Sequence, residues 1–257
     1  MTDTAGFSST SQAFNSSYDS SIYVGYKYTS GTQYGLDTNS PIKTHLDSWY
    51  TSNLNSDSTV DTSGNKYDKY ISRTAIYCND RTIGGNGTWS SYGDTFYFQA
   101  YYRLAQWNFT GLMPTYTCSQ LNDRFTTSTT TGNGRLYNAS NVESPIATIT
   151  ADEVSYAGGL DGVSNTSYYM YQNATSGSES WWTMSPSYWN SGYSAYMIYV
   201  GGSSDGGKLG SAEVDSTSYG VRPVLSLKSC VQWSEGNGTT ATPYQVRINS
   251  SCISAEN

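Results

Sequence analysis

Residues 180–228 read SWWTMSPSYWNSGYSAYMIYVGGSSDGGKLGSAEVDSTSYGVRPVLSLK, and the rest of the chain is organised around this stretch. An apolar and aromatic run at 195–200 precedes a glycine-serine turn, and a second strand-like run follows at 221–227. Large aromatic rings supply contact area at low entropic cost, while Ser, Asn and Gly supply adaptable hydrogen bonds. The stretch therefore predicts a polar, aromatic recognition face that is displayed on a β framework.

The whole chain is poor in charge and rich in aromatic residues. Of its 257 residues, 13% are charged and 15% are aromatic, with 25 Tyr and 7 Trp. Disordered chains have few aromatic residues and much charge, so this composition indicates a folded chain. The net charge of -7 argues against nucleic-acid partners and anionic membrane surfaces, because both select basic proteins. No apolar run is long enough to cross a bilayer, so we expect no membrane insertion.

The cysteines are Cys78, Cys118, Cys230 and Cys252, and no two of them form a CxxC motif. With a single histidine in the chain they do not make a usual zinc set, and we expect no metal or cofactor. An even number of cysteines in a chain rich in Ser, Thr and Asn indicates disulfides, and hence an extracellular or cell-surface location. Three pairings are possible. Order and proximity favour Cys78–Cys118 and Cys230–Cys252.

Two helices are indicated by their capping residues. Ser40 can cap a helix that begins with a proline and runs to about Leu54, with apolar residues at helical spacing. Thr150 and Glu153 form a capping box, and the Gly-Gly pair at 158–159 ends that second helix.

Other runs predict strands and divide the chain. The aromatic runs at 96–104 and 168–171 read as strands, and the alternating run at 244–248 reads as a half-exposed strand. The expected organisation is a flexible Ser/Thr-rich arm (1–20), a single domain (21–229) and a C-terminal hairpin or strand appendage (230–257).

Five stretches carry a resemblance to a known family. They are residues 42–50 (IKTHLDSWY), 78–82 (CNDRT), 149–159 (ITADEVSYAGG), 182–186 (WTMSP) and 220–228 (GVRPVLSLK). Together they resemble the C-type lectin fold, in the branch shared by formylglycine-generating enzymes and the variable proteins of diversity-generating retroelements. They are similar to secreted or pilus-tip-like surface proteins of gut Firmicutes. The resemblance implies an α+β fold in which two helices pack on irregular antiparallel β-sheets, stapled by disulfides.

The resemblance also implies where a ligand binds. In retroelement-diversified members the segment that corresponds to about 180–228 varies at solvent-facing positions of a rigid scaffold. The candidate ligand-binding residues are Ser187, Tyr188, Trp189, Asn190, Ser191, Tyr193, Tyr196 and Ile198, together with Trp181, which fits either the binding face or the core. We assign to the core Trp182, Met184, Ala195, Met197 and Val221.

Catalytic chemistry finds little support in the sequence. Formylglycine-generating enzymes use cysteines near the closing strand, whereas here that strand reads VRPV at 221–224 and the next cysteine is Cys230. His45 lies off the apolar stripe of its helix and reads as a surface residue. Lectins of this fold that hold sugar through calcium carry Glu-Pro-Asn or Gln-Pro-Asp and a later Trp-Asn-Asp, and these tripeptides are absent. We expect no catalytic residue.

A short echo, Asn-Asp-Arg, occurs at 79–81 and again at 122–124. Asparagine and aspartate oxygens are calcium ligands. They also cap turns, which is the commoner role, so the echo does not predict a metal site.

These observations favour a non-catalytic extracellular binding domain of the adhesin or receptor type. Its expected partner is a protein or a glycan on another cell, a host or a phage. Two alternatives stay open: a structural surface or pilus subunit, and a formylglycine-generating-type oxidase. A pilin-type apolar helix encoded upstream of residue 1 would favour the first alternative, and reactive thiols would favour the second.

Overall fold

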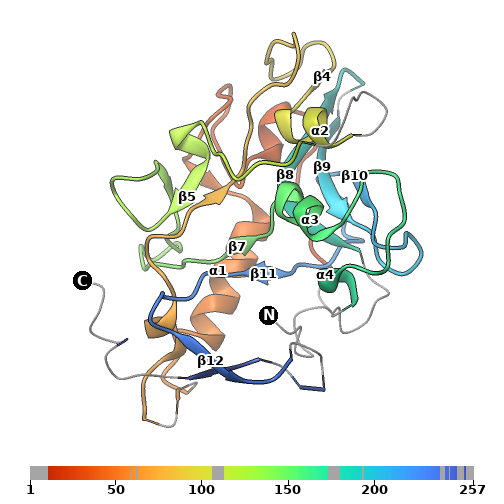
Figure 1. The fold of residues 1–257 in the computed structure, drawn as a ribbon. Coiled ribbons are helices and arrows are strands. Elements are labelled where there is room, and N and C mark those ends of the chain that lie inside the picture. The colour runs from red at the N-terminus through yellow and green to blue at the C-terminus, as the bar shows by residue number, and fades with distance from the viewer. Residues whose placement is uncertain are drawn as a thin grey trace.

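The computed structural model describes residues 11–58, 60–61, 63–105, 113–172, 180–192, 194–237, 241–242, 244–247 and 252. The helices are α1 (Pro41–Asn53), α2 (Gln99–Leu104), α3 (Ala151–Ala157) and α4 (Tyr169–Gln172), with 3-10 turns η1 (Ser21–Val24), η2 (Tyr67–Tyr70) and η4 (Leu121–Asp123). The strands are β1 (Lys27–Tyr28), β2 (Thr38–Asn39), β3 (Tyr77–Cys78), β4 (Phe96–Tyr97), β5 (Arg124–Thr126), β6 (Gly134–Arg135), β7 (Ala147–Thr148), β8 (Trp181–Asn190), β9 (Ser194–Val200), β10 (Leu209–Glu213), β11 (Pro223–Val224), β12 (Gln232–Glu235) and β13 (Gln245–Arg247). Short helices and several mostly antiparallel sheets confirm the α+β class (Figure 1).

The largest sheet has the strand order β10-β9-β8-β4, and all its neighbours are antiparallel. Side chains alternate between its two faces, as the period of a strand requires. On β9, Ala195 and Met197 join the hydrophobic cluster that includes α1, whereas Ile198 and Val200 join the cluster that includes α2 and α3. The sheet therefore lies between α1 on one face and α2 with α3 on the other, and we call the latter its second face (Figure 1).

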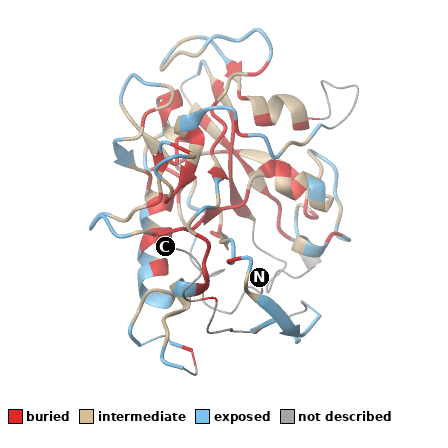
Figure 2. Ribbon diagram, turned by 60° about the vertical axis from the view of Figure 1, so that its left-hand side comes forward, coloured by how far each residue is buried: buried red, intermediate tan, exposed pale blue. Residues whose placement is uncertain are grey.

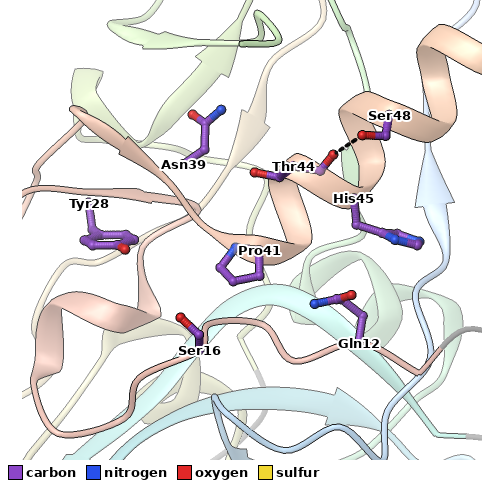
Figure 3. Close-up of a pocket in the computed structure, with 8 residues that line it drawn as sticks. All are labelled: Gln12, Ser16, Tyr28, Asn39, Pro41, Thr44, His45 and Ser48. Atoms are coloured by element: carbon purple, nitrogen blue, oxygen red, sulfur yellow. Dashed lines mark hydrogen bonds between the residues drawn. The ribbon is translucent and has the colours of Figure 1, made fainter.

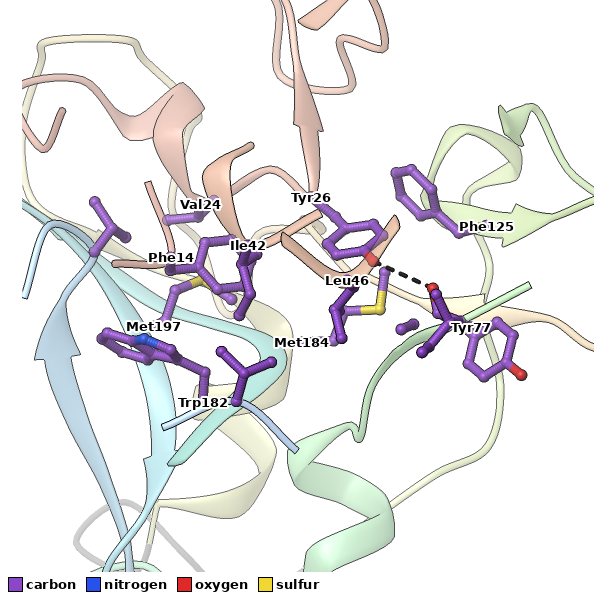
Figure 4. Packing of buried hydrophobic residues seen from close by; sticks show 14 of the residues in the cluster. Phe14, Val24, Tyr26, Ile42, Leu46, Tyr77, Phe125, Trp182, Met184 and Met197 are labelled. Atoms are coloured by element: carbon purple, nitrogen blue, oxygen red, sulfur yellow. Dashed lines mark hydrogen bonds between the residues drawn. The ribbon is translucent and has the colours of Figure 1, made fainter. Parts of the chain in front are cut away.

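The larger cluster forms where α1 meets the sheet. The stripe of Ile42, Leu46 and Tyr50 is fully buried, as the helical spacing predicts. Figure 4 shows Ile42 and Leu46 among residues from the N-terminal segment, β8 and β9. The predicted core residues are confirmed, because each is 0% exposed: Trp182, Met184, Ala195, Met197 and Val221.

Both predicted helices begin at their capping residues, and both end where the sequence indicates. The Ser40 hydroxyl accepts a hydrogen bond from the backbone N–H of Lys43 at 3.3 Å, and α1 ends at Asn53. In α3 the Thr150 hydroxyl accepts from the Glu153 N–H at 3.1 Å, and the Glu153 carboxylate accepts from the Thr150 N–H at 2.8 Å. Gly158 follows α3 with φ of 115°, in the left-handed region where glycine has no Cβ penalty.

The expectation of a flexible arm is wrong for residues 11–20. Phe14 is fully buried and meets the Trp182 ring edge-on, with 6.2 Å between ring centroids. The backbone N–H of Gln12 donates to the Tyr219 carbonyl at 3.0 Å, and that of Asn15 donates to Val214 at 2.9 Å. One apolar anchor and strand-like hydrogen bonds are enough to hold this polar segment. The remainder of the expected arm lies outside the described residues.

Of two predicted strands, the one at 96–104 is a strand only at its start and the one at 168–171 is mostly helical. Only Phe96–Tyr97 pairs as a strand, and α2 follows directly. Ala100 and Leu104 lie four residues apart, so the helix places both against the second face of the sheet. The run at 168–171 becomes the short helix α4. Short aromatic runs are ambiguous between the two periods, and tertiary packing decides between them.

Both predicted disulfides are confirmed. Cys78 pairs with Cys118 and Cys230 pairs with Cys252, with Cα–Cα distances of 5.8 and 5.4 Å. The second disulfide closes the segment that carries the β12–β13 hairpin, whose β13 falls within the predicted strand at 244–248. Figure 2 shows the buried residues gathered in the middle of the molecule and the exposed β12 at its lower edge.

Within the ranges described, no helix combines the length and apolar character that a bilayer span requires.

Candidate functional site

Tyrosine side chains from the sheet and from α2 cluster on the second face. They are Tyr97 from β4, Tyr101 from α2, Tyr188 from β8 and Tyr196 from β9, and we call them the tyrosine face. The rings of Tyr188 and Tyr196 stack with centroids 4.3 Å apart, and those of Tyr97 and Tyr101 stack at 5.5 Å. Tyr188 lies 5.8 Å from both Tyr97 and Tyr101. All four rings are half-buried, so they form one continuous aromatic surface that water reaches.

Irregular pairing of β8 turns Tyr188 towards this surface. In a regular strand residue 188 would share a face with Trp182 and Met184, which are buried in the core beside α1. The β8–β9 register shifts between Trp182 and Pro186, and again between Pro186 and Trp189. A bulge reverses the alternation that follows it. Consequently Trp189 points into the core and Tyr188 points out.

Glu213 supplies the carboxylate of the tyrosine face. It lies opposite Tyr196 in the β10–β9 ladder, and its Oε1 accepts a hydrogen bond from the Tyr196 hydroxyl at 2.9 Å. Burial, together with the Glu213 carboxylate, raises the pKa of Tyr196, while burial and the neighbouring Tyr101 raise the pKa of Tyr188. Both phenols therefore remain neutral hydroxyl donors at physiological pH. One hydrogen bond leaves the carboxylate with further acceptor capacity.

Three members of this site were missed in the sequence: Tyr97, Tyr101 and Glu213. Tyr97 is the last residue of β4, and Tyr101 lies four residues later in the first turn of α2, where their rings stack. Because the sequence predicts a strand over 96–104, it gives no reason to expect contact between these two rings. Glu213 gives no sequence signal, because only strand pairing brings it opposite Tyr196.

The expectation that Trp189 and Ser187 face solvent is wrong, since both are 0% exposed. The Trp189 indole N–H donates to the Gly93 carbonyl at 2.9 Å, so its polar atom is satisfied inside the protein. The Ser187 and Ser211 hydroxyls are hydrogen-bonded to each other at 2.5 Å across the sheet. Trp189 packs in the core beside α1. The buried Ser187 side chain links β8 to β10.

Trp181 and Ile198 are also buried, at 2% and 3% exposure. Both belong to the cluster between the second face and α2 with α3. The Arg222 guanidinium lies 3.5 Å from the centre of the Trp181 ring, and its Nη1 donates to the Met170 carbonyl at 3.3 Å. Arg222 is therefore a half-buried framework residue. Trp181 belongs to the core rather than to the binding face.

The remaining candidates that the structure describes are Tyr188, Tyr196, Asn190 and Ser191. Tyr188 and Tyr196 form its centre, and Asn190 is half-buried opposite Ser194 at the end of the same strand pair. Ser191 is exposed, and its backbone N–H donates to the Thr95 hydroxyl at 2.9 Å. Tyr193 lies outside the described residues.

The repeated Asn-Asp-Arg segments bind each other rather than a ligand. The Arg81 Nε and backbone N–H donate to the two carboxylate oxygens of Asp123, at 2.6 and 2.7 Å. Both side chains are essentially unexposed. The buried Asn79 amide accepts from the Tyr26 N–H at 2.7 Å and donates to the Met184 carbonyl at 2.9 Å. Asn79 therefore links the backbone at Tyr26 to β8.

Among the described residues, no three His, Cys, Asp or Glu side chains gather in a way that suits a metal ion.

No model of a protein family, no curated protein and no solved structure matches the chain. The role of the tyrosine face is therefore inferred from its own groups. Four rings offer apolar surface and hydroxyls, and Glu213 offers a charged acceptor. Such a surface is suited to binding a ligand through apolar contacts and hydrogen bonds.

Proposed function

We propose that this chain is a non-catalytic extracellular binding domain of the C-type lectin-like type, and that the tyrosine face contacts its ligand. The single observation that carries the proposal is the continuous patch of four half-buried tyrosines on the second face of the sheet. Because the four rings are half-buried, part of their apolar area reaches the surface.

Tyrosine is suited to this role because a large apolar body carries a polar tip. Tyr and Trp are enriched among the residues that dominate binding energy at protein interfaces. Mutual stacking also limits the rotamers of Tyr188 and Tyr196 before a ligand arrives, and this lowers the entropic cost of association. The Tyr196 hydroxyl is held by Glu213, which restricts the ring further.

Three features support the C-type lectin-like assignment. The capped helices α1 and α3 pack on opposite sides of an antiparallel sheet, whose long strands β8 and β9 follow α3 in the chain. A closing Arg-Pro segment follows that sheet, with Pro223 in the two-stranded pair β11–β7. If the gene is diversified by a retroelement, we propose that variation falls on Tyr188, Asn190, Ser191 and Tyr196 rather than on the buried candidates.

The two disulfides support an extracellular or cell-surface location, because disulfides persist in oxidising compartments. They also support a non-catalytic role over a formylglycine-type oxidase, which needs reactive thiols, since all four cysteines are paired. The proposed partner is a protein or glycan on another cell, a host or a phage.

The test is a screen of the purified chain against glycan and surface-protein arrays, repeated with a Tyr188→Ala/Tyr196→Ala variant. The matched control is Tyr116→Ala/Tyr156→Ala, since these two exposed rings also stack, at 4.4 Å, but lie elsewhere. We expect the first variant to lose affinity by about 1000-fold, as the loss of two interface hot spots of about 2 kcal/mol each would, and the control to keep its affinity. Unchanged binding by the first variant, or equal loss in both, would refute the proposal.

A further inference from the structure

An open hollow of about 430 Å³ lies on the side of the molecule where the N-terminal segment passes the first turns of α1. Figure 3 shows Pro41 in the middle of this hollow, with Tyr28 on one side and Gln12 and His45 on the other. Asn39, from β2, lies on the same side of Pro41 as Tyr28 in this view. The tyrosine face contributes no residue to this lining, so the hollow is a separate feature.

The walls of the hollow are held in place by contacts with the core. The carbonyl of Gln12 accepts a hydrogen bond from the Trp182 indole N–H at 2.7 Å. The backbone N–H of Ile42 donates to the Phe14 carbonyl at 3.4 Å, which fixes the N-terminal segment against α1. The Tyr28 ring meets the Tyr23 ring edge-on at 5.2 Å. The hollow is therefore preformed, as ligand sites usually are.

The lining carries no Asp, Glu, Lys or Arg. Its one titratable imidazole, His45, has a pKa below the ordinary 6.5 because it is partly buried, so it is neutral at physiological pH. A charged ligand would lose hydration here without meeting an opposite charge, and that is unfavourable. A neutral ligand incurs no such cost.

The uncharged groups of the hollow are both donors and acceptors. The amides of Gln12 and Asn39 each carry an N–H₂ and a carbonyl oxygen. The Ser48 hydroxyl donates to the Thr44 carbonyl at 2.9 Å, and the Thr44 hydroxyl donates to the Ser40 carbonyl at 3.2 Å. Because both hydroxyls already donate, they present acceptor lone pairs to the hollow.

Two rings add apolar surface between these polar groups: the phenol of Tyr28 and the pyrrolidine of Pro41. A ligand that fits must combine several hydroxyl groups with C–H surfaces and carry no charge. We propose that the hollow is a binding site for a neutral saccharide, with C–H groups packed on Tyr28 and Pro41 and hydroxyls bonded to the two amides. This site is independent of the tyrosine face.

The test uses ligand-observed saturation-transfer NMR with glucose, galactose, mannose and N-acetylglucosamine at millimolar concentration. Glucuronate and glucosamine serve as charged relatives. We expect transfer to at least one neutral sugar and at least tenfold weaker binding of both charged relatives. Asn39→Ala and Tyr28→Ala should each weaken the neutral sugar about tenfold, the usual effect of losing one good polar or ring contact.

Two further variants make the outcome decisive. Asn53→Ala, at the exposed far end of α1, should leave sugar binding unchanged. Thr44→Arg, at an exposed position in the lining, should block the hollow without disturbing the core. The proposal is overturned if no neutral sugar shows transfer, if the charged relatives bind equally well, or if Thr44→Arg binds normally. Loss of sugar binding in Tyr188→Ala, with the hollow variants intact, would assign the sugar to the tyrosine face instead.

Discussion

Replacing Trp189 by alanine tests whether this residue belongs to the core or to the binding surface. The sequence suggests a solvent-facing ring, whose loss would weaken binding and leave folding intact. In the structure the ring is 0% exposed and its N–H is bonded to Gly93 at 2.9 Å. Truncating a buried Trp to Ala removes about 3–5 kcal/mol. The unpaired Gly93 carbonyl adds about 1 kcal/mol. We therefore expect the free energy of unfolding to fall by about 5 kcal/mol.

Urea denaturation followed by fluorescence and circular dichroism measures this effect. With a denaturant slope of about 3 kcal/mol/M, the midpoint should fall by about 1.7 M. Trp189→Phe keeps a ring but loses the donor, so it should cost less, about 1–2 kcal/mol. Trp233→Ala is the matched control, because Trp233 is 69% exposed and its loss should change stability by less than about 0.5 kcal/mol. A Trp189→Ala protein with an unchanged midpoint would refute the packing described here.

Three other changes test the framework. Hydrogen bonds from Tyr70 and nearby amides lower the pKa of Asp61 from 3.8 to about 2. The ionised carboxylate therefore stabilises the fold above pH 4, and this stabilisation is lost as the pH falls towards 2. In Asp61→Asn the free energy of unfolding should depend less on pH in that window, which urea midpoints measured at several pH values would reveal. Asn79→Ala leaves three buried backbone groups without their hydrogen-bond partner. It should lower the free energy of unfolding by about 3 kcal/mol, measured by urea titration. Replacing Cys78 and Cys118 by serine opens a loop with sequence separation 40 and should cost about 4 kcal/mol, measured by thermal unfolding.

Features that depend on neighbouring residues could be predicted from the sequence. The Ser40 cap and the Thr150–Glu153 box fix α1 and α3, because a capping hydrogen bond joins residues only three positions apart. The disulfide pairs also followed chain order. Core residues of β8 and β9 were identifiable because Met184 and Met197 have no polar group to satisfy.

The candidate site was predicted only in part, because its geometry depends on pairing between distant segments. A register shift in β8 exchanges the faces of Tyr188 and Trp189, and no local pattern encodes that shift. Tyr97 and Glu213 reach the tyrosine face through strand pairing with β8 and β9. Likewise, Phe14 orders a segment whose composition alone is typical of disorder.

The distribution of charge bears on both proposed sites. Only 13% of the residues are charged, yet several of these are buried in ion pairs: Lys43 with Asp47, Arg81 with Asp123, and Arg103 with Asp152. Charge used for internal structure is not available to partners at the surface. The tyrosine face has one carboxylate, already bonded to Tyr196, and the hollow has no charged lining residue. Because salt screens exposed charges and leaves apolar and neutral polar contacts largely unaffected, binding at either site should change little between low and physiological salt. A steep loss of affinity with salt would point instead to a charged surface outside both sites.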